Sequence, residues 1–268
     1  GHPNLCDTNA ETGAAQYDGT LRLRTGDRGV HQMAKLGVFA DRIVVPQQAC
    51  HPIPDRVPMD VAALIGCCVT TGVGAVINSP AMKPGATVAV FGCGGVGLNA
   101  VQGAKLMNGS RIIAVDIFDH KLEFAYKFGA TDVVNSREVN AVEAIRELTG
   151  GGADMSLDTF GSPVTTADAV ASLRKGGTAV LVGLAPVGET APIDMVDMVR
   201  NQKALVGSYY GSASPHETFG KLVEFYIRGL LDVESLITRS YTLDQINEGF
   251  DALARGEDGR GIIRYKGA

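Results

Sequence analysis

The sequence has no excess of basic residues, since 24 lysines and arginines stand against 29 aspartates and glutamates among its 268 residues. Nucleic acids and anionic membrane surfaces bind clustered basic faces, so we expect neither as a partner of a chain whose formal net charge is −5. The sequence also lacks an apolar run of the roughly 20 residues that would cross a bilayer. The longest apolar stretch, Ala62–Val76, is interrupted by Thr70 and Thr71, and we expect it to form a buried helix.

Cysteines are few, and their spacing does not fit a disulfide framework. There are five, Cys67 and Cys68 are adjacent, and none belongs to a C-x-x-C pair. We therefore expect reduced thiols or metal ligands. The chain opens with polar Gly-His-Pro-Asn instead of the basic and then apolar segments of a secretory signal, so the expected location is the cytoplasm.

Strands and helices alternate along the middle of the chain. Continuous apolar strands that are each followed by an amphipathic helix predict a parallel sheet covered on both faces, which is a doubly wound α/β domain. The expected strands are Thr87–Phe91, Arg111–Val115, Asp132–Val134, Asp154–Asp158 and Thr178–Gly183, and the expected helices are Gly97–Asn108, His120–Phe128, Val142–Leu148 and Val164–Lys175. Lys203–Tyr209 is expected to add a sixth strand.

The segments on either side of this alternation have other patterns. Residues 1–57 are rich in turn formers, and the β-branched run Gly37–Val45, which Pro46 ends, predicts a strand. A helix is expected from Met59 to Asn78. After Gly211 the pattern predicts helices Pro215–Gly229 and Leu243–Gly256 and a terminal strand Gly261–Tyr265.

A glycine-rich motif follows the first strand of the alternation. The segment Gly92-Cys-Gly-Gly-Val-Gly97 matches G-x-G-x-x-G and stands at the start of a helix. In such a turn Gly92 permits the tight bend, Gly94 lets the backbone approach a pyrophosphate, and Gly97 lets helix and strand pack closely. The helix N-terminus then faces the negative charge. The predicted dinucleotide contacts are Gly92, Gly94, Gly95, Val96 and Gly97.

Asp116 follows the second strand, where the adenosine ribose of a dinucleotide is expected. A carboxylate there accepts hydrogen bonds from the ribose hydroxyls and repels a 2′-phosphate, and the neighbours Ile117 and Phe118 offer no arginine that would bind one. We therefore expect NAD rather than NADP, with Asp116 and Ile117 as contacts. The alternative is an ordinary glycine turn in which Asp116 merely caps the next helix.

Several motifs are shared with a known family. They are Ala63-Leu-Ile-Gly-Cys67, Thr70-Thr-Gly-Val-Gly74, the run from Lys83 to Gly97, Lys127-Phe-Gly-Ala-Thr-Asp132 and Ile246-Asn-Glu-Gly-Phe250. Together they resemble the zinc-dependent medium-chain alcohol dehydrogenases, collinearly over nearly the whole chain. Asp18-Gly-Thr and His31-Gln-Met33 are similar to the nicotinoprotein branch, which keeps NAD tightly bound and is assayed with an artificial nitroso acceptor.

The resemblance implies a domain division and further cofactor contacts. Residues 69–209 would form the Rossmann NAD-binding domain, and residues 1–68 and 210–268 would belong to a β-rich GroES-like catalytic domain. Thr71 matches a residue at the nicotinamide, Lys121 one near the adenosine ribose, and Arg260 one at the pyrophosphate, while Val182 and Leu184 match the backbone that meets the carboxamide. Lysines and arginines are more often solvated surface charges, and that alternative stays open for Lys121 and Arg260.

The resemblance also implies two zinc ligands. Cys67 matches the last cysteine of a catalytic set of two cysteines and a histidine, in which zinc acts as a Lewis acid on the alcohol oxygen. The alternative is that Cys67 is a small buried hydrophobe like Cys68. Cys6 resembles the fourth sulfur ligand of a structural zinc lobe. The other ligands would come from an N-terminal third that is absent here, so the chain as written is not expected to turn over alcohol.

The leading expectation is an NAD-dependent, zinc-assisted oxidoreductase that interconverts small alcohols with aldehydes or ketones by hydride transfer. One alternative is a zinc-free reductase of activated double bonds, against which Cys67 argues, and another is a non-catalytic dinucleotide-binding module. A homo-oligomer is expected, because in the family the sixth strands of two coenzyme domains pair, and an uncovered strand edge favours such pairing.

Overall fold

The structure, a computed structural model, describes residues 2–257 and 259–265 and forms two compact units. The smaller unit combines residues 1–58 with 237–268, and the larger unit is residues 59–236. These limits differ from the predicted divisions at 68/69 and 209/210. The reason is that the helix that begins at Met59 and the segment after residue 209 both pack within the larger unit.

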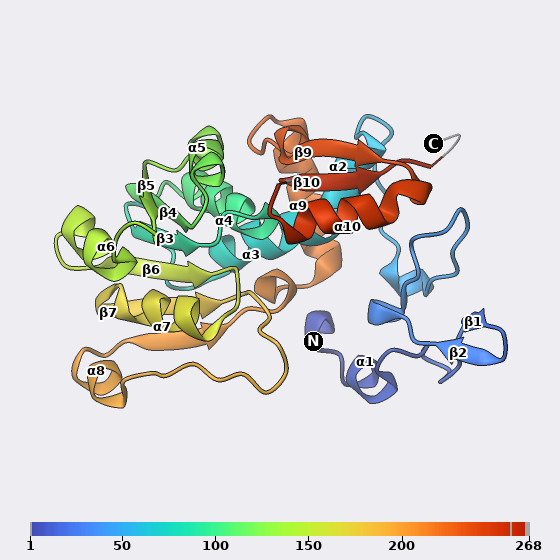
Figure 1. Ribbon diagram of the computed structural model, residues 1–268, viewed down its shortest axis with the longest axis horizontal. Helices are drawn as coiled ribbons and strands as arrows, with labels where there is room; N and C mark the ends of the chain where they lie inside the picture. The colour runs from blue at the N-terminus through green and yellow to red at the C-terminus, as the bar shows by residue number, and fades with distance from the viewer. Residues whose placement is uncertain (1, 258, 266–268) are drawn as a thin grey trace. The chain divides into compact units, whose positions relative to one another are not determined.

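A six-stranded parallel sheet forms the centre of the larger unit (Figure 1). Its strands are β3 (Thr87–Phe91), β4 (Arg111–Asp116), β5 (Asp132–Asn135), β6 (Ala153–Asp158), β7 (Leu173–Leu181) and β8 (Ala204–Gly207). Their order is β5-β4-β3-β6-β7-β8, and every neighbouring pair is parallel. The predicted doubly wound α/β domain, with its sixth strand, is confirmed.

Helices between the strands cover this sheet. They are α4 (Gly95–Leu106), α5 (Asp119–Phe128), α6 (Ala141–Thr149), α7 (Pro163–Ala171) and α8 (Met195–Arg200), and α9 (Pro215–Ile227) follows the last strand. The central strands β3 and β4 bury successive residues, Val88–Phe91 and Ile112–Val115, because both faces of the sheet are covered.

The strand order reverses beside β3. The chain leaves β3 for β4 and β5 on one side and then returns to β6 on the other side. In open α/β sheets, ligands bind outside the carboxyl ends of the strands at such a reversal. The carboxyl ends of β3, β4 and β6 are therefore where the structure favours a site.

The predicted helix over residues 59–78 is present, but it contains a turn of another kind. It consists of α2 (Met59–Leu64), a π-helical turn (Ile65–Val69) and α3 (Thr70–Ile77). Two glycines of α3 allow close packing on two sides. A Cβ on Gly72 would lie 2.2 Å from the Val96 carbonyl oxygen of α4, and one on Gly74 would lie 2.7 Å from the Cα of Gly211.

This continuous helix, Met59–Ile77, is also long and apolar enough to span a membrane, with a mean hydropathy of 1.9. Within the larger unit, however, 61% of its most apolar window is buried. It packs there against α4 and α9, which is the setting of a core helix and agrees with the buried helix expected from the sequence.

The boundary between α7 and β7 was predicted too late in the chain. The helix begins with a capping box between Ser162 and Thr165 and ends at Ala171, not at Lys175. The strand then starts at Leu173, which pairs with Ala153 of β6. Leu173–Lys175 are therefore already part of a strand where the last turn of the helix was expected.

The smaller unit has little regular structure. It contains α1 (Asp7–Thr12), an antiparallel pair β1 (Leu23–Thr25) and β2 (Arg28–Val30), a parallel pair β9 (Ile237–Tyr241) and β10 (Arg260–Ile263), and α10 (Ile246–Ala254). The terminal strand was predicted as Gly261–Tyr265 and is confirmed at β10. The strand predicted over Gly37–Val45 is wrong, because that segment pairs with no strand among the described residues, and β-branched residues form a strand only beside a backbone partner.

Candidate dinucleotide-binding site

The turn between β3 and α4 contains glycines that the fold itself requires at two positions. Gly92 has a φ of +94°, in the left-handed region that favours glycine. A Cβ on Gly97 would lie 1.7 Å from the Gly92 carbonyl oxygen, so no larger residue fits there. The chain therefore bends sharply after β3, and α4 begins directly against the bend.

Gly94 is a glycine for which the fold gives no reason. Its φ of −78° and ψ of −173° are open to any residue, and an added Cβ would meet no atom within 4 Å. No side chain caps α4, so the first amides of the helix lack a side-chain acceptor and can bind an anion. A pyrophosphate placed against this turn would occupy the space that a side chain at position 94 would fill, so the turn fits a dinucleotide.

Asp116 joins this turn to the end of β4. Its Oδ2 accepts a hydrogen bond from the Cys93 amide at 2.7 Å, and its Oδ1 accepts from the Ile117 and Phe118 amides at 2.8 and 3.1 Å. Capping of α5 does not account for this arrangement, because the residue at the N-cap of α5 is Phe118. The bond from the Cys93 amide instead connects Asp116 to the glycine turn. Oδ1 uses both of its lone pairs in these bonds, whereas Oδ2 retains one that can accept from a ribose hydroxyl.

The Cys93 thiol within the turn is not expected to act as a nucleophile. Its side chain is buried, and burial, followed by the charge of Asp116, raises the pKa of the thiol far above its ordinary range, although Lys121 opposes the shift. The thiolate is the reactive form of cysteine. Cys93 therefore contributes its backbone amide to the site and no nucleophile.

The end of β6 supplies residues that the sequence analysis did not identify. Asp158 is almost completely buried, and its carboxylate accepts from the amides of Phe160 and Gly161 at 3.1 and 2.9 Å and from the Thr166 hydroxyl at 2.7 Å. The Thr159 hydroxyl contacts the Gly92 carbonyl oxygen at 2.8 Å. These bonds hold the turn after β6 against the glycine turn.

Two apolar side chains remain exposed beside the glycine turn. Phe160 follows β6 and is 67% exposed, and Ile117 follows β4 and is 43% exposed. Because β4 and β6 pair with opposite sides of β3, these side chains flank the turn from two sides. The polar residues Asp158 and Thr159 at the end of β6 were the sequence signal for this part of the site. Only the strand order, however, shows that they lie beside the glycine turn after β3.

The other predicted contacts of the larger unit lie around the same end of the sheet. The Lys121 ammonium lies 5.1 Å from the centre of the Phe118 ring. The Val182 amide, just beyond β7, donates to the Asp158 carbonyl oxygen at 2.9 Å, and Leu184 is exposed in the loop that follows. Thr71 lies on α3, which packs against the first turn of α4.

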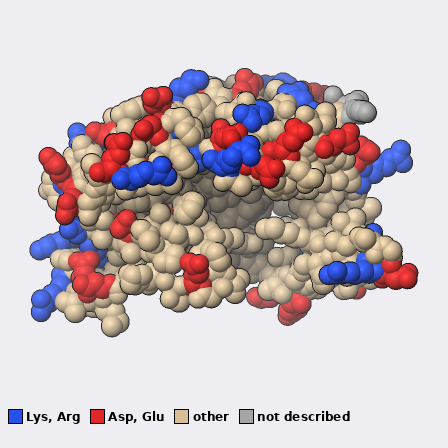
Figure 2. Space-filling view, viewed as in Figure 1, with Lys and Arg blue, Asp and Glu red and all other residues tan. Residues whose placement is uncertain are grey.

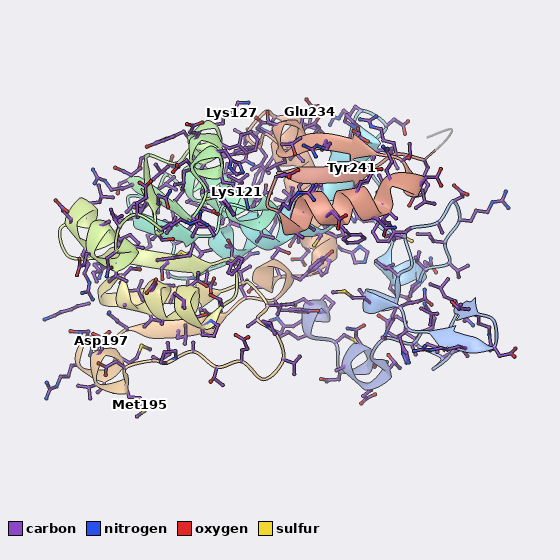
Figure 3. The ribbon with its side chains drawn as sticks, in the orientation of Figure 1. Lys121, Lys127, Met195, Asp197, Glu234 and Tyr241 are labelled. Atoms are coloured by element: carbon purple, nitrogen blue, oxygen red, sulfur yellow. The ribbon has the colours of Figure 1, made fainter. Side chains whose placement is uncertain are left out.

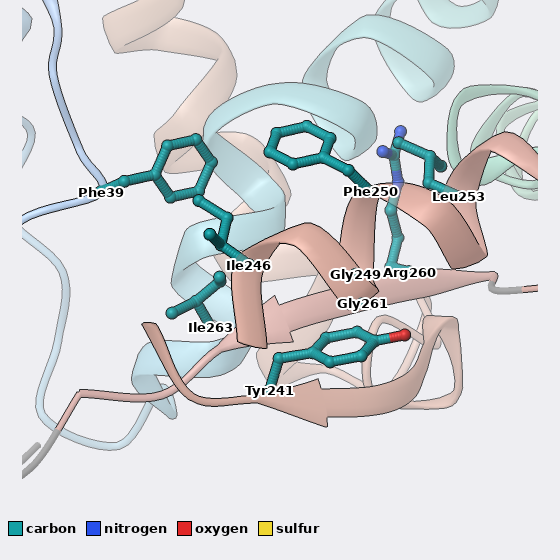
Figure 4. A pocket seen from close by; sticks show the side chains of 9 residues that line it. All are labelled: Phe39, Tyr241, Ile246, Gly249, Phe250, Leu253, Arg260, Gly261 and Ile263. Atoms are coloured by element: carbon teal, nitrogen blue, oxygen red, sulfur yellow. The ribbon is translucent and has the colours of Figure 1, made fainter. Parts of the chain in front are cut away.

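Arg260 belongs to the smaller unit, so its predicted contact with the pyrophosphate stays a prediction. It lines an apolar pocket there with Phe250 and Leu253 (Figure 4). Its buried Nε has no hydrogen-bond partner among the described residues, which leaves a donor for a ligand.

Cys67 lies in the π-helical turn, and its side chain is exposed, whereas that of Cys68 is buried. The alternative that Cys67 is a buried hydrophobe is therefore wrong. The Tyr210 hydroxyl donates to the Gly66 carbonyl oxygen next to it. Burial, together with Cys67 and Tyr209, raises the pKa of Tyr210 from 10.0 to about 12, so this hydroxyl remains a donor at neutral pH. Single π-helical turns occur often at functional sites.

The described residues do not fit a zinc ion. Nowhere in residues 2–257 and 259–265 do three histidine, cysteine or acidic side chains come together as a metal site. Cys67 in the larger unit and Cys6, which is exposed in the smaller unit, each lack such a set. The predicted zinc sites are therefore not assembled by this part of the chain.

Charged side chains of both signs are interspersed over the face of the molecule seen in Figure 2. Lysines and arginines do not gather there into one basic surface. The expectation that nucleic acids are not partners stays a prediction, which this face does not contradict.

Comparison with known proteins agrees with the geometry. Residues 95–228 match the family described as zinc-binding dehydrogenase. S-(hydroxymethyl)glutathione dehydrogenase of Saccharomyces cerevisiae is 35% identical over 98% of this chain and 70% of that protein. Alcohol dehydrogenase B of Mycobacterium tuberculosis is 34% identical over 99% of this chain and 72% of that protein. The crystal structure of benzyl alcohol dehydrogenase from Acinetobacter calcoaceticus has a TM-score of 0.86 at 30% identity, over 99% of this chain and 75% of that one.

The fold and these matches define an oxidoreductase of the alcohol dehydrogenase type. The chain belongs to the zinc-binding, medium-chain alcohol dehydrogenase family, and the predicted resemblance is confirmed. It spans 70% to 75% of the length of the relatives named above. Its membership of the nicotinoprotein branch stays a prediction.

Proposed function

We propose that this protein uses NAD to interconvert a small alcohol with its aldehyde or ketone. The observation that carries the proposal is the turn after β3, where Gly94 leaves space in front of the uncapped α4 and Asp116 lies at the end of the next strand. No side chain of the described residues fills that space, and its surroundings suit the pyrophosphate and ribose of a dinucleotide.

The binding mode follows from the groups around the turn. The first amides of α4 would hold the pyrophosphate, and Asp116 Oδ2 would accept from an adenosine ribose hydroxyl. The exposed side chains of Ile117 and Phe160 would enclose the adenine between apolar surfaces. The roles of Thr71, Val182, Leu184 and Arg260 at the nicotinamide and pyrophosphate rest on the family resemblance.

When bound, NAD would supply the hydride acceptor for the alcohol carbon, and the proton of the alcohol oxygen would pass to solvent. The site's own residues orient the nicotinamide ring through the adenosine end of the cofactor. The family implies zinc as the Lewis acid at the alcohol oxygen. Because the described residues do not assemble a ligand set, we derive no step through it.

The relatives suggest which substrates to test. Their names specify benzyl alcohol in one case and S-(hydroxymethyl)glutathione in another. The five cysteines all lie among the described residues and form no disulfide there, which supports a reducing compartment such as the cytoplasm for this protein.

The test uses the full-length protein expressed with zinc, because the described residues assemble no zinc site and this chain alone is not expected to turn over alcohol. That protein is titrated with NAD by calorimetry. The titration is followed by measurement of the absorbance of reduced nicotinamide after addition of ethanol, benzyl alcohol or the formaldehyde adduct of glutathione. We expect NAD to bind and at least one substrate to reduce it. NAD binding without reduction by any of the three would favour the non-catalytic module, and oxidation of NADH by an activated double bond in zinc-free protein would favour the reductase. Either result would overturn the proposal.

A further inference from the structure

The adenosine end of the candidate site holds two cations in addition to the acid. The ring of Phe118, two residues beyond Asp116, lies 5.1 Å from the Lys121 ammonium and 5.4 Å from the guanidinium carbon of Arg137. Lys121 belongs to the first turn of α5, where Figure 3 labels it. Arg137 comes from the turn after β5, so it follows a different strand from Asp116, which ends β4.

Hydrogen bonds hold that turn against the end of β4. The Ser136 amide donates to the Asp116 carbonyl oxygen at 3.0 Å. The Asn135 amide group donates to Asp119 Oδ1 at 2.6 Å, and Asn135 Oδ1 accepts from the Arg137 amide at 3.0 Å. Asn135 thus fixes the turn to the start of α5, and Arg137 is placed beside Phe118 by backbone contacts rather than by its flexible side chain alone.

The sequence around Asp116 contains no arginine for a 2′-phosphate, but the folded chain brings one from β5. The Asp116 carboxylate would repel a 2′-phosphate, while a guanidinium and an ammonium on the adjacent ring would attract it. Asp119, the other acid here, already accepts from Asn135. The two effects oppose each other, so the balance between NAD and NADP depends on which charge dominates.

We propose that Arg137, with Lys121, forms a latent 2′-phosphate site beside the adenosine ribose, and that the charge of Asp116 keeps this site closed to NADP. Arg137 is then a second residue that determines cofactor specificity. The inference rests on the proposed NAD site, because it requires the adenosine to lie at the end of β4.

The experiment is a double-mutant cycle on the full chain, with NAD and NADP titrated by calorimetry into wild type, Asp116→Asn, Arg137→Ala and the double variant. Asparagine removes the charge and keeps one acceptor oxygen, which can serve either the Cys93 amide or the Ile117 and Phe118 amides, because these bond to different oxygens of Asp116. Titration of this variant with NAD therefore checks that the turn still binds a dinucleotide. Lys127→Ala is the matched control, because Lys127 lies in the last turn of α5, the helix of Lys121, and is over the Phe124 ring instead of the Phe118 ring.

We expect Asp116→Asn to raise the affinity for NADP by about tenfold or more, which corresponds to about 1.4 kcal/mol. Arg137→Ala in that background should remove most of the gain, whereas Lys127→Ala should leave it within about twofold. The gain should also shrink at high salt, because the cations are near the surface.

Failure of the proposed function and failure of the latent phosphate site give different results in this experiment. If wild type binds neither dinucleotide, the proposed function fails. If wild type binds NAD, but the NADP gain of Asp116→Asn is the same with and without Arg137, the NAD site stands and the latent phosphate site is wrong. Circular dichroism of each variant checks that the fold is retained.

Discussion

Gly94 and Gly97 lie three residues apart in one turn but are glycines for different reasons. A Cβ at position 97 would overlap the Gly92 carbonyl oxygen, whereas a Cβ at position 94 would enter open space. Substitution by alanine at each position therefore separates the needs of the fold from those of the cofactor.

We expect Gly94→Ala to leave the free energy of unfolding within about 0.5 kcal/mol of wild type, as for most substitutions that meet no other atom, and to weaken NAD binding at least about tenfold. Gly97→Ala should instead lower the free energy of unfolding by about 2 kcal/mol or more, because backbone atoms must move. Urea denaturation and calorimetry measure the two quantities. Unchanged NAD binding by Gly94→Ala would show that the pyrophosphate does not lie against this turn.

Tyr210 offers a second test at the scale of one residue. Its φ of +55° is in the left-handed region, and its hydroxyl donates to the Gly66 carbonyl oxygen in the π-helical segment that carries Cys67. Strained backbone of this kind persists only where neighbours hold it. The hydroxyl is therefore expected to fix the position of Cys67.

Tyr210→Phe should lower the free energy of unfolding by about 1 kcal/mol, the usual net contribution of one hydrogen bond. It should also speed amide exchange in Ile65–Val69 and change the rate at which iodoacetamide alkylates Cys67. The matched control is Tyr126→Phe on α5, which is half exposed. An alkylation rate equal to that of wild type would contradict a positioning role for the hydroxyl.

The residues of the site were only partly predictable from the sequence. The glycine turn and Asp116 were found because each stands at the end of an apolar strand and a helix follows. Phe160, Tyr210 and Arg137 were missed because their neighbours at the site are distant in sequence and depend on which strands and helices pack together. Sequence spacing identifies residues that act within one turn, but not residues that two turns share.

At the scale of secondary structure, β3, β6 and β7 are joined by one carboxylate. Asp154 Oδ2 accepts from the Thr87 amide and hydroxyl at 2.7 and 2.8 Å, and Oδ1 accepts from Arg174 Nε at 2.6 Å. Burial alone would raise the pKa of Asp154, but the bonds from Thr87 and Arg174 outweigh it and lower the pKa below 3.8. The ionised form is therefore the one that the fold stabilises.

A depressed folded-state pKa gives a stabilisation that is complete above the unfolded pKa of about 3.8 and is lost as the pH falls through the lower folded value. We expect Asp154→Asn to lower the free energy of unfolding at pH 7 by about 1.5 kcal/mol, the net contribution of hydrogen bonds to a charged group. Below about pH 4 the difference should shrink, because wild type loses its advantage on protonation. Urea denaturation at several pH values checks this, and a difference that stays constant down to pH 2 would contradict it.

Elements of the sheet were predicted better than those outside it. The central strands β3 and β4 carry unbroken apolar runs because both of their faces are buried, so their pattern is strong. The segment Gly37–Val45 has similar residues but pairs with no strand among the described residues, and β9 was missed because its partner β10 lies on the other side of α10 in the sequence. A local sequence pattern does not show which distant segments pair with each other.

For the whole molecule, the two edges of the large sheet differ in a way that bears on assembly. Edge strand β5 carries Asp132, which Arg111 contacts at 3.5 Å, and charges on an edge discourage pairing with another chain. Edge strand β8 has the uncharged sequence Ala-Leu-Val-Gly, and its Val206 is 41% exposed. We therefore propose β8 as the edge through which two copies of this chain pair.

If two copies pair through β8, Val206→Lys should convert the dimer to monomer or weaken it at least tenfold, because a lysine would meet its counterpart near the two-fold axis and like charges repel. The control is Val139→Lys, which adds the same charge at an exposed valine just after β5 and should leave the dimer intact. Sedimentation velocity over a range of concentrations measures both. A monomeric wild type would rule out pairing through β8. A dimer that Val139→Lys disrupts and Val206→Lys does not would assign the interface to a different surface.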